Sequence, residues 1–240
     1  MAENKLTLLH LQHSQSQTIL WLLEELKGEY NFEYELKVFE RVKQRAPEAL
    51  KETHPLGKSP QLITETGRVI TERDAIALYL IDRFDTAGKF KIASAPASTD
   101  DDAVKENMII SFGNSSLGTN VILRFIFKAL VANTPFFLRP LPYGISALLN
   151  KAFLDAEIDA TFSYFDSLLE GREYLLGGKG PTRADFVLLW YIDWAKQSEL
   201  YDAPSPKFKN IQEWFSRCTS RPAWKSGLEK GNGYNLVDFQ

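Results

Sequence analysis

The sequence predicts an α/β domain followed by an all-α domain. Three observations support this prediction. Strand and helix patterns in the order β-α-β-α-β-β-α occupy residues 1–85. A small, polar, proline-containing stretch then predicts a linker over residues 86–102. Residues 103–240 contain helical patterns and no convincing strand, so we expect this second domain to be built of helices alone.

The first three elements form a β-α-β unit. Residues 6–11 are a nearly continuous apolar run, typical of a central strand covered on both faces. Residues 16–27 carry leucine and isoleucine at helical spacing, and Gly28 is well placed to end this helix. Residues 32–38 alternate polar and apolar side chains, as a half-buried strand does. Because such crossovers are right-handed, the two strands should be parallel.

The remaining elements of the first domain are shorter. Residues 45–50 predict a short helix. Residues 61–64 and 69–71 predict two strands, and the segment between them is a hairpin signal. Thr71 and Asp74 have the spacing of a capping box, which predicts that the last helix of this domain begins there.

Four helical patterns follow in the second domain, over residues 103–132, 143–170, 182–197 and 207–228. Thr182 and Asp185, at the start of the third pattern, have capping-box spacing before a very apolar stretch. We therefore expect both residues to stabilise the fold and to take no part in chemistry.

The composition argues against several classes of protein. The chain has 240 residues, 44% hydrophobic and 25% charged, which is ordinary for a soluble globular protein. A net charge of −3 without a local basic run argues against nucleic-acid binding. No apolar run approaches the roughly 18 residues that cross a bilayer, and the first residues lack the pattern of a signal peptide. These features predict a cytoplasmic protein without a membrane span.

Cysteine and histidine give little indication of reactive or metal chemistry. The one cysteine, Cys218, excludes an intrachain disulfide, and its amphipathic helical setting predicts a packed, inert thiol. The three histidines share no metal-ligand spacing on a helix face, so we expect no metal.

The segment 54–63, HPLGKSPQLI, carries the clearest functional signal. A proline favours an extended residue before it, here Ser59, and the bond to Pro60 is a candidate cis peptide. An extended residue with outward backbone groups can pair with a short peptide. The helix start near Glu72 offers amide donors to a carboxylate. Together these features predict a cradle for a small anionic peptide.

Several motifs resemble those of the cytosolic glutathione transferases, in particular the serine-type and the fungal or bacterial members. They are the loop at 54–60, the helix start at 72–76, Ser14 with the helix that follows it, and the segment 180–185. The match covers almost the whole chain in order and spacing. The resemblance implies a thioredoxin-like domain that binds glutathione as a co-substrate, with no tightly bound cofactor. It also implies an all-α domain that shapes a pocket for a small hydrophobic electrophile, and a homodimer.

Ser14 is the residue that the resemblance places at the reacting sulfur. Its hydroxyl would donate a hydrogen bond to the glutathione thiolate and lower the pKa of the thiol. A shift of about two units from about 8.5 requires about 2.7 kcal/mol, and one hydroxyl with a helix end supplies roughly that much. Ser16 is the alternative donor, and a further alternative is that Ser14 only caps the helix.

The resemblance assigns the peptide itself to the proline loop and the helix after it. Ser59, before Pro60, would pair through its backbone with the cysteinyl unit, and Lys58 would meet the glycine carboxylate. Glu72 would accept a hydrogen bond from the γ-glutamyl ammonium. Three more residues are weaker candidates near the glycine carboxylate: Arg41, Lys43 and His54.

Three departures from the family pattern affect the γ-glutamyl end. Arg73 stands where the family usually has a serine that holds the γ-glutamyl carboxylate. Gln15 and Thr18 stand where many members have arginine. Arg73 either replaces the serine hydroxyl with a charge-assisted contact or points to solvent and leaves only backbone amides.

A stripe on the first helix of the second domain is the candidate electrophile pocket, because this face borders the pocket in the family. The stripe contains Met108, Phe112, Ser115, Ser116 and Thr119. Ordinary core or a dimer interface is the alternative for such a stripe.

These expectations combine into a detoxifying glutathione transferase, in which the thiolate attacks an electrophilic carbon or reduces a hydroperoxide. The first alternative is a non-catalytic, transferase-like binding or regulatory protein, which Arg73, Gln15 and Thr18 favour. The second alternative, a cysteine-based glutathione-dependent oxidoreductase, is opposed by Ser14, because such enzymes have cysteine at that place.

Overall fold

The N-terminal domain is built on a four-stranded mixed sheet with the strand order β2-β1-β3-β4. Strand β1 pairs in parallel with β2 and antiparallel with β3, and β3 pairs antiparallel with β4. The strands are β1 (Thr7–Leu11), β2 (Glu35–Phe39), β3 (Gln61–Ile63) and β4 (Val69–Thr71). The computed structural model describes residues 5–92, 100–201 and 206–237. It confirms the predicted order of elements and the parallel β-α-β unit.

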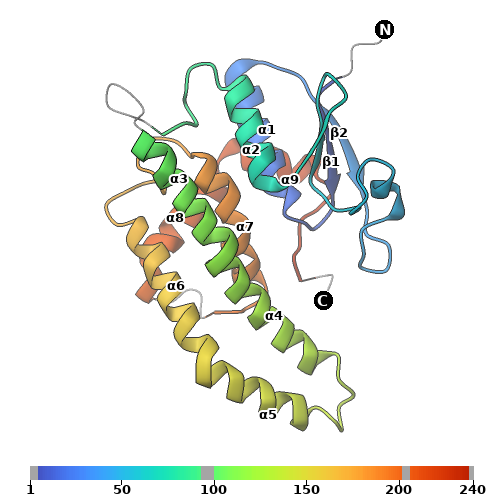
Figure 1. Cartoon of the computed structure of the whole chain (residues 1–240), viewed down its shortest axis with the longest axis vertical. Coiled ribbons are helices and arrows are strands. Elements are labelled where there is room, and N and C mark those ends of the chain that lie inside the picture. Colours follow the sequence, from blue (N-terminus) through green and yellow to red (C-terminus); the bar gives the residue numbers. More distant parts are fainter. Residues whose placement is uncertain (1–4, 93–99, 202–205, 238–240) are drawn as a thin grey trace.

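Helix α1 (Ser16–Tyr30) is longer than expected, and Gly28 does not end it. Asn31 ends the helix in the left-handed region with a φ of 52°, and its N–H donates to the Lys27 carbonyl at 3.0 Å. Asparagine tolerates this conformation better than most residues with a side chain, so it can stop a helix as glycine does. Helices α1 and α2 (Arg73–Phe84) lie on the face of the sheet that is turned toward the second domain (Figure 1).

The start of α2 differs from the expected capping box. Glu72, and not Thr71, occupies the cap position, with φ 67° and ψ 122°, and no side chain caps the helix. The chain therefore turns sharply from β4 into α2 at Glu72. Between β2 and β3 the expected short helix is a single 3-10 turn, η1 (Glu48–Lys51).

Helices alone make up the described part of the second domain, as predicted (Figure 1). The first begins at Asp100, inside the stretch expected as a linker. The expected fourth helix is two helices, because Pro222 has no amide N–H and Arg221 before it is extended. The helices and helical turns are α3 (Asp100–Phe112), η2 (Gly113–Leu117), α4 (Gly118–Ala132), α5 (Pro140–Leu149), η3 (Asn150–Leu154), α6 (Asp155–Leu168), α7 (Arg183–Gln197), η4 (Pro206–Phe208), α8 (Lys209–Ser220) and α9 (Pro222–Lys230).

Helix α7 joins the two domains, since it contacts α1 and α2 as well as α3 and α4. Its start carries the predicted capping box. Two glycines let the long α3–η2–α4 helix approach it closely. A Cβ atom at Gly113 would lie 2.5 Å from Leu188, and one at Gly118 would lie 2.7 Å from Tyr191. These close contacts determine which face of the long helix meets α7.

This long helix also corrects an expectation about membranes. Its segment Asp101–Ala132 is long and apolar enough, by length and composition, to cross a bilayer, although no such run was expected. Only 22% of the apolar window of this helix is buried inside the structure, and a single such helix is by itself weak evidence of a span.

The buried side chain of His10, the fourth of the five residues of β1, should make the free energy of unfolding depend on pH. Its Nδ1 atom lies 2.6 Å from the Ser16 hydroxyl, and burial lowers its pKa from 6.5 to about 4. Between pH 6.5 and about 4 the unfolded chain therefore binds more protons than the folded chain. The free energy of unfolding has its full value above pH 6.5 and falls by about 3 kcal/mol as the pH drops toward 4.

Urea unfolding across this pH range measures the effect. The variant His10→Asn should lose most of this pH dependence, whereas the control His54→Asn, at a half-buried loop position, should keep it. If the free energy of unfolding of His10→Asn falls with pH as steeply as that of the wild type, other groups cause the acid sensitivity.

Candidate active site

A cleft of about 760 Å³ opens between the two domains beside the start of α1. From the first domain, the β1–α1 turn, the proline loop and the start of α2 line it. From the second domain it is lined by three aromatic side chains of α4 and α7: Phe125, Trp190 and Trp194. The structure thus places polar groups of the first domain opposite an aromatic wall of the second.

The proline loop has the geometry that the sequence predicts. The Ser59–Pro60 bond is cis. The Ser59 hydroxyl donates to the Leu9 carbonyl and accepts from the Leu11 N–H, both at 2.9 Å. In the described part of the chain, the N–H and C=O of Ser59 have no backbone partner. Both groups are therefore open to pair with a peptide in the cleft.

Ser14 lies between β1 and α1 and lines the cleft, with 6% of its surface exposed. Its hydroxyl donates to the Leu11 carbonyl at 2.7 Å, and the Ser16 N–H donates to its oxygen at 3.2 Å. A hydroxyl carries one proton, so Ser14 can donate to a ligand only by releasing Leu11. Ser16, the alternative donor, is fully buried against His10 and does not line the cleft.

Glu72 and Gln15 lie where the cleft meets two recesses. Both residues line the main cleft, a recess of about 390 Å³ that Arg73 shares, and a recess of about 20 Å³ that His54 shares. The φ of 67° at Glu72 is costly for a residue with a side chain, and such conformations are often kept at functional sites. Gln15 was not among the predicted site residues. Its position directly after Ser14 is the signal that could have identified it.

Arg73 does not point to solvent, which excludes one of its two expected orientations. It is 4% exposed, and its guanidinium lies 5.5 Å and 4.7 Å from the ring centroids of Trp190 and Tyr191. Its Nη2 lies 3.5 Å from Asn114 Oδ1, and Nε and Nη1 have no partner among the described residues. Burial lowers the pKa of this guanidinium. The recess beside Glu72 is therefore lined by a buried cation whose Nε and Nη1 are enclosed by protein atoms.

The other predicted cations divide into two groups. Lys58 is exposed and Arg41 is partly buried, and both line the cleft. Arg41 donates to the carbonyl groups of His13 and Gln44 at 2.9 Å and 3.1 Å, and burial lowers its pKa. Lys43, at an exposed turn, lines neither the cleft nor its recesses.

The residues of the predicted electrophile stripe do not line this cleft, and their role at an electrophile pocket stays a prediction: Met108, Phe112, Ser115, Ser116 and Thr119. Met108 is 63% exposed to solvent, and Phe112 packs on Tyr164 with 4.8 Å between ring centroids. The physical reason is the close approach of Gly113 and Gly118 to α7, which turns the stripe away from the first domain.

Aromatic residues that sequence reasoning missed form the apolar wall instead. Trp190 and Trp194 stack with 4.8 Å between centroids, and Phe125 lies 5.0 Å from Trp194. The signal for the two tryptophans is their i, i+4 spacing, which places them on one face of a helix. An aromatic wall beside polar groups is typical of sites for small ligands.

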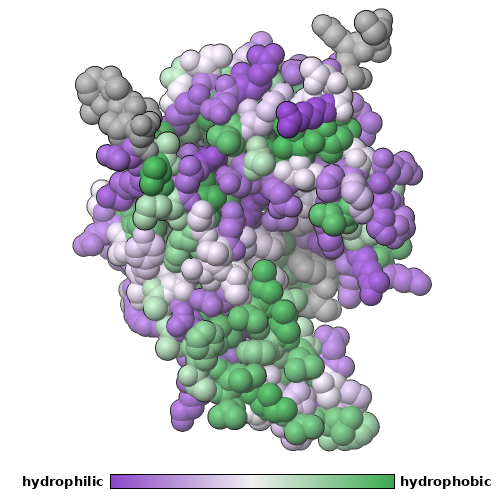
Figure 2. Space-filling model, viewed as in Figure 1, coloured by the Kyte–Doolittle hydropathy of each residue, from purple (hydrophilic) through white to green (hydrophobic). Residues whose placement is uncertain are grey.

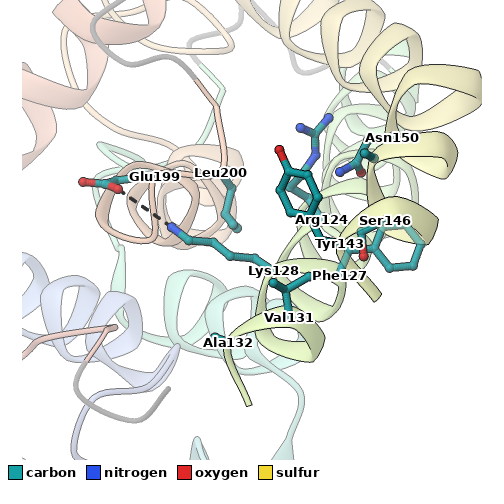
Figure 3. A pocket seen from close by; sticks show the side chains of 11 residues that line it. Arg124, Phe127, Lys128, Val131, Ala132, Tyr143, Ser146, Asn150, Glu199 and Leu200 are labelled. Atoms are coloured by element: carbon teal, nitrogen blue, oxygen red, sulfur yellow. Dashed lines mark ion pairs between the residues drawn. The ribbon is translucent and has the colours of Figure 1, made fainter. Parts of the chain in front are cut away.

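A second cavity, of about 460 Å³, lies between α4 and α5. Phe127, Val131 and Tyr143 line its apolar part, and Lys128 extends across it to within 3.8 Å of Glu199 (Figure 3). None of the predicted site residues lines this cavity, so it is distinct from the cleft.

Cys218 is fully buried in α8, which confirms the expected packed thiol. Burial raises the pKa of this thiol well above its usual value, so the reactive thiolate is disfavoured.

The fold and the cleft define a class of two-domain proteins in which a thioredoxin-like domain holds a small ligand against a helical domain. Comparison with known proteins identifies the family. The glutathione S-transferase N-terminal domain matches residues 4–82, and the C-terminal domain matches residues 151–222. Glutathione S-transferase 3 of Schizosaccharomyces pombe is 30% identical over 96% of this chain and 89% of its own length. The chain belongs to the glutathione S-transferase family.

Solved structures agree with this assignment. A glutathione S-transferase from Actinobacillus pleuropneumoniae is 28% identical, with a TM-score of 0.73 over 97% of this chain and 94% of that one. Ure2p5 from Phanerochaete chrysosporium, cocrystallised with 1-(S-glutathionyl)-2,4-dinitrobenzene, is 23% identical. Its TM-score is 0.70 over 97% of this chain and 96% of that one. The latter likeness concerns the fold alone. The expected fold, a thioredoxin-like domain followed by an all-α domain, is confirmed.

Proposed function

We propose that this protein is a transferase that conjugates the glutathione thiolate to small electrophiles. The observation that carries the proposal is the presence of Ser14 and the unpaired Ser59 backbone in one cleft, beside the start of α1. The Ser14 hydroxyl and the first amide groups of α1 would stabilise the thiolate. The aromatic wall would hold an apolar electrophile next to it, and this proximity lowers the barrier.

The remaining groups of glutathione have matching partners in this proposal. Lys58, which is exposed and lines the cleft, would meet the glycine carboxylate together with Arg41. Glu72 would accept a hydrogen bond from the γ-glutamyl ammonium, and the Arg73 guanidinium would turn a donor into the recess to bind the γ-glutamyl carboxylate. Arg73 would then replace the serine hydroxyl of the usual family pattern.

Two measurements on the full-length protein test the proposal. We expect retention on immobilised glutathione and turnover of a chromogenic aryl halide with glutathione. Absence of retention would contradict glutathione binding in any role. The same stabilised thiolate would also reduce hydroperoxides. Turnover of an organic hydroperoxide with glutathione measures this peroxidase activity.

The alternative is a non-catalytic glutathione-binding or regulatory protein. One observation favours it, because the single Ser14 proton is donated to the Leu11 carbonyl and not to the cleft. Retention on glutathione together with no turnover of any electrophile would support this alternative.

Arg73 gives a specific prediction for glutathione affinity. Arg73→Ser should weaken binding by about tenfold to one-hundredfold, because hydrogen bonds to charged groups contribute about 1.5–3 kcal/mol. Arg73→Lys should recover only part of the affinity, since lysine lacks the planar pair of donors. Isothermal titration with glutathione measures both changes.

The control is Arg68→Ser, at an exposed arginine of the β3–β4 turn that lines neither the cleft nor its recesses. It should leave the affinity unchanged. Equal or stronger binding by Arg73→Ser would show that Arg73 serves only to join α2 to α7.

Detoxification as the physiological role, a cytoplasmic location, a homodimer, and domain boundaries at residues 85 and 102 complete the proposal. They come from the resemblance and the sequence. Size-exclusion chromatography with light scattering tests the homodimer.

A further inference from the structure

The end of the second domain farthest from the sheet carries an exposed apolar surface, where the end of α4 and α5 protrude (Figure 1, Figure 2). We define the apolar tip as six exposed side chains: Phe136, Phe137, Leu138, Leu141, Ile145 and Leu148. Phe136 is 80% exposed and Leu141 is 70% exposed. Adjacent large apolar side chains with this exposure mark a site of interaction with a partner or a membrane.

The segment that carries the apolar tip has only basic residues among its charged side chains. The sequence contains no acidic residue between Glu106 and Asp155. The same stretch contains four bases, of which Arg124 pairs with Asp155 and Lys128 lies 3.8 Å from Glu199. Arg139 and Lys151 form no ion pair in the described part of the chain, and Arg139 donates to the carbonyl groups of Ala132 and Thr134. An apolar surface edged by cations is complementary to a negatively charged apolar partner.

The apolar tip is also separate from the parts of the chain that define the family. The family domains match residues 4–82 and 151–222, and all six tip residues lie between these segments. None of the six tip residues lines the cleft. The exposed surface therefore calls for a role other than glutathione binding.

We propose that the apolar tip inserts into the interface of an anionic membrane. Phe136 and Phe137 would lie at the level of the lipid headgroups, where aromatic side chains are favoured. Leu141 and its apolar neighbours on α5 would enter the upper acyl region. Arg139 and Lys151 would extend toward acidic headgroups, as long basic side chains do at membrane surfaces.

A second copy of the chain is a poorer occupant of this surface. A symmetric contact between two tips would bring Arg139 and Lys151 of both copies together with no acidic residue of the stretch between them. The protruding shape also suits insertion into lipid better than contact with a flat protein surface (Figure 1). The proposal is independent of the glutathione chemistry, so either can fail alone.

Cosedimentation of the full-length protein with lipid vesicles tests the proposal. We expect binding to phosphatidylcholine vesicles that contain phosphatidylserine to be about tenfold stronger than to pure phosphatidylcholine, and to weaken with salt. The triple variant Phe136→Ser, Phe137→Ser, Leu141→Ser should lose about tenfold or more in binding. A matched control, Leu78→Ser with Val104→Ser, removes exposed apolar side chains outside the tip and should bind as the wild type does.

A second readout locates the inserted residues. Because the native Cys218 is fully buried, an environment-sensitive dye attached to Phe137→Cys reports on the apex alone. Its emission should shift to the blue with anionic vesicles. Absence of binding to these vesicles, or equal binding by the triple variant, would overturn the proposal. Conversion of a dimer to a monomer in the triple variant, without loss of vesicle binding, would instead assign the tip to a dimer interface.

Discussion

Replacement of Ser14 by alanine is expected to lower kcat/KM for glutathione conjugation by about tenfold to one-hundredfold. A hydrogen bond to a charged group contributes about 1.5–3 kcal/mol, and each 1.36 kcal/mol corresponds to a factor of about ten. The amide groups at the start of α1 would remain, so part of the thiolate stabilisation should survive.

The pH–rate profile gives the more specific test of Ser14. Loss of the hydroxyl should raise the pKa of bound glutathione thiol by about one to two units. The variant should then lose most of its rate near neutral pH, where its thiolate fraction is small. Above the raised pKa both proteins hold the thiolate, so the difference between them should narrow.

Ser16→Ala is the matched control, because it removes the neighbouring hydroxyl, which lies 3.1 Å from the Ser14 hydroxyl and 2.6 Å from His10 Nδ1 and does not line the cleft. It should change stability and leave the pH–rate profile in place. If Ser14→Ala and the wild type have equal rates and profiles, Ser14 does not activate the thiol, and the start of α1 acts alone.

Replacement of Asp185 by asparagine should cost about 2–6 kcal/mol in the free energy of unfolding. Asp185 is fully buried, and one of its oxygens accepts from the Leu175 N–H at 3.0 Å and the Trp214 indole N–H at 2.7 Å. The other accepts from the N–H and hydroxyl of Thr182 at 2.8 Å and 2.9 Å. Asparagine keeps one oxygen, so two buried donors lose their acceptor, at about 1–3 kcal/mol each, and face an NH₂ group instead.

Urea unfolding measures this loss against a total stability of about 5–15 kcal/mol for such proteins. Thr182→Ala removes one side of the same network and should cost about 1–2 kcal/mol, which stays measurable if Asp185→Asn does not fold. The control Asp159→Asn, at an exposed pair with Lys207, should cost less than about 1 kcal/mol. A smaller loss for Asp185→Asn than for Thr182→Ala would contradict the role of this network.

Features that depend on adjacent residues could be predicted from the sequence. Pro60 restricts the backbone of Ser59 directly before it and makes a cis bond accessible, and the bond between them is cis. Thr182 and Asp185 are three residues apart on one helix turn, and their capping box forms as predicted. Local sterics and local hydrogen bonds act before any tertiary contact does.

Helix boundaries were less predictable, because several local signals compete at each end. Gly28 can end a helix, but α1 continues through it to Asn31, where the left-handed conformation is equally accessible. Thr71 and Asp74 have capping-box spacing, yet Glu72 takes the cap position with a left-handed φ. The choice between such signals depends on how the completed helix packs.

By itself, the sequence determined the order of strands and helices and the proline loop, since these rest on periodicity and neighbouring residues. It also contains the motifs that resemble the glutathione transferases. The tertiary structure alone decided that Arg73 is buried against α7, that Trp190 and Trp194 line the cleft, and that the apolar tip is exposed. The physical reason is that helical periodicity shows which residues share a face. What that face meets depends on close contacts between distant segments, here Gly113 and Gly118 against α7.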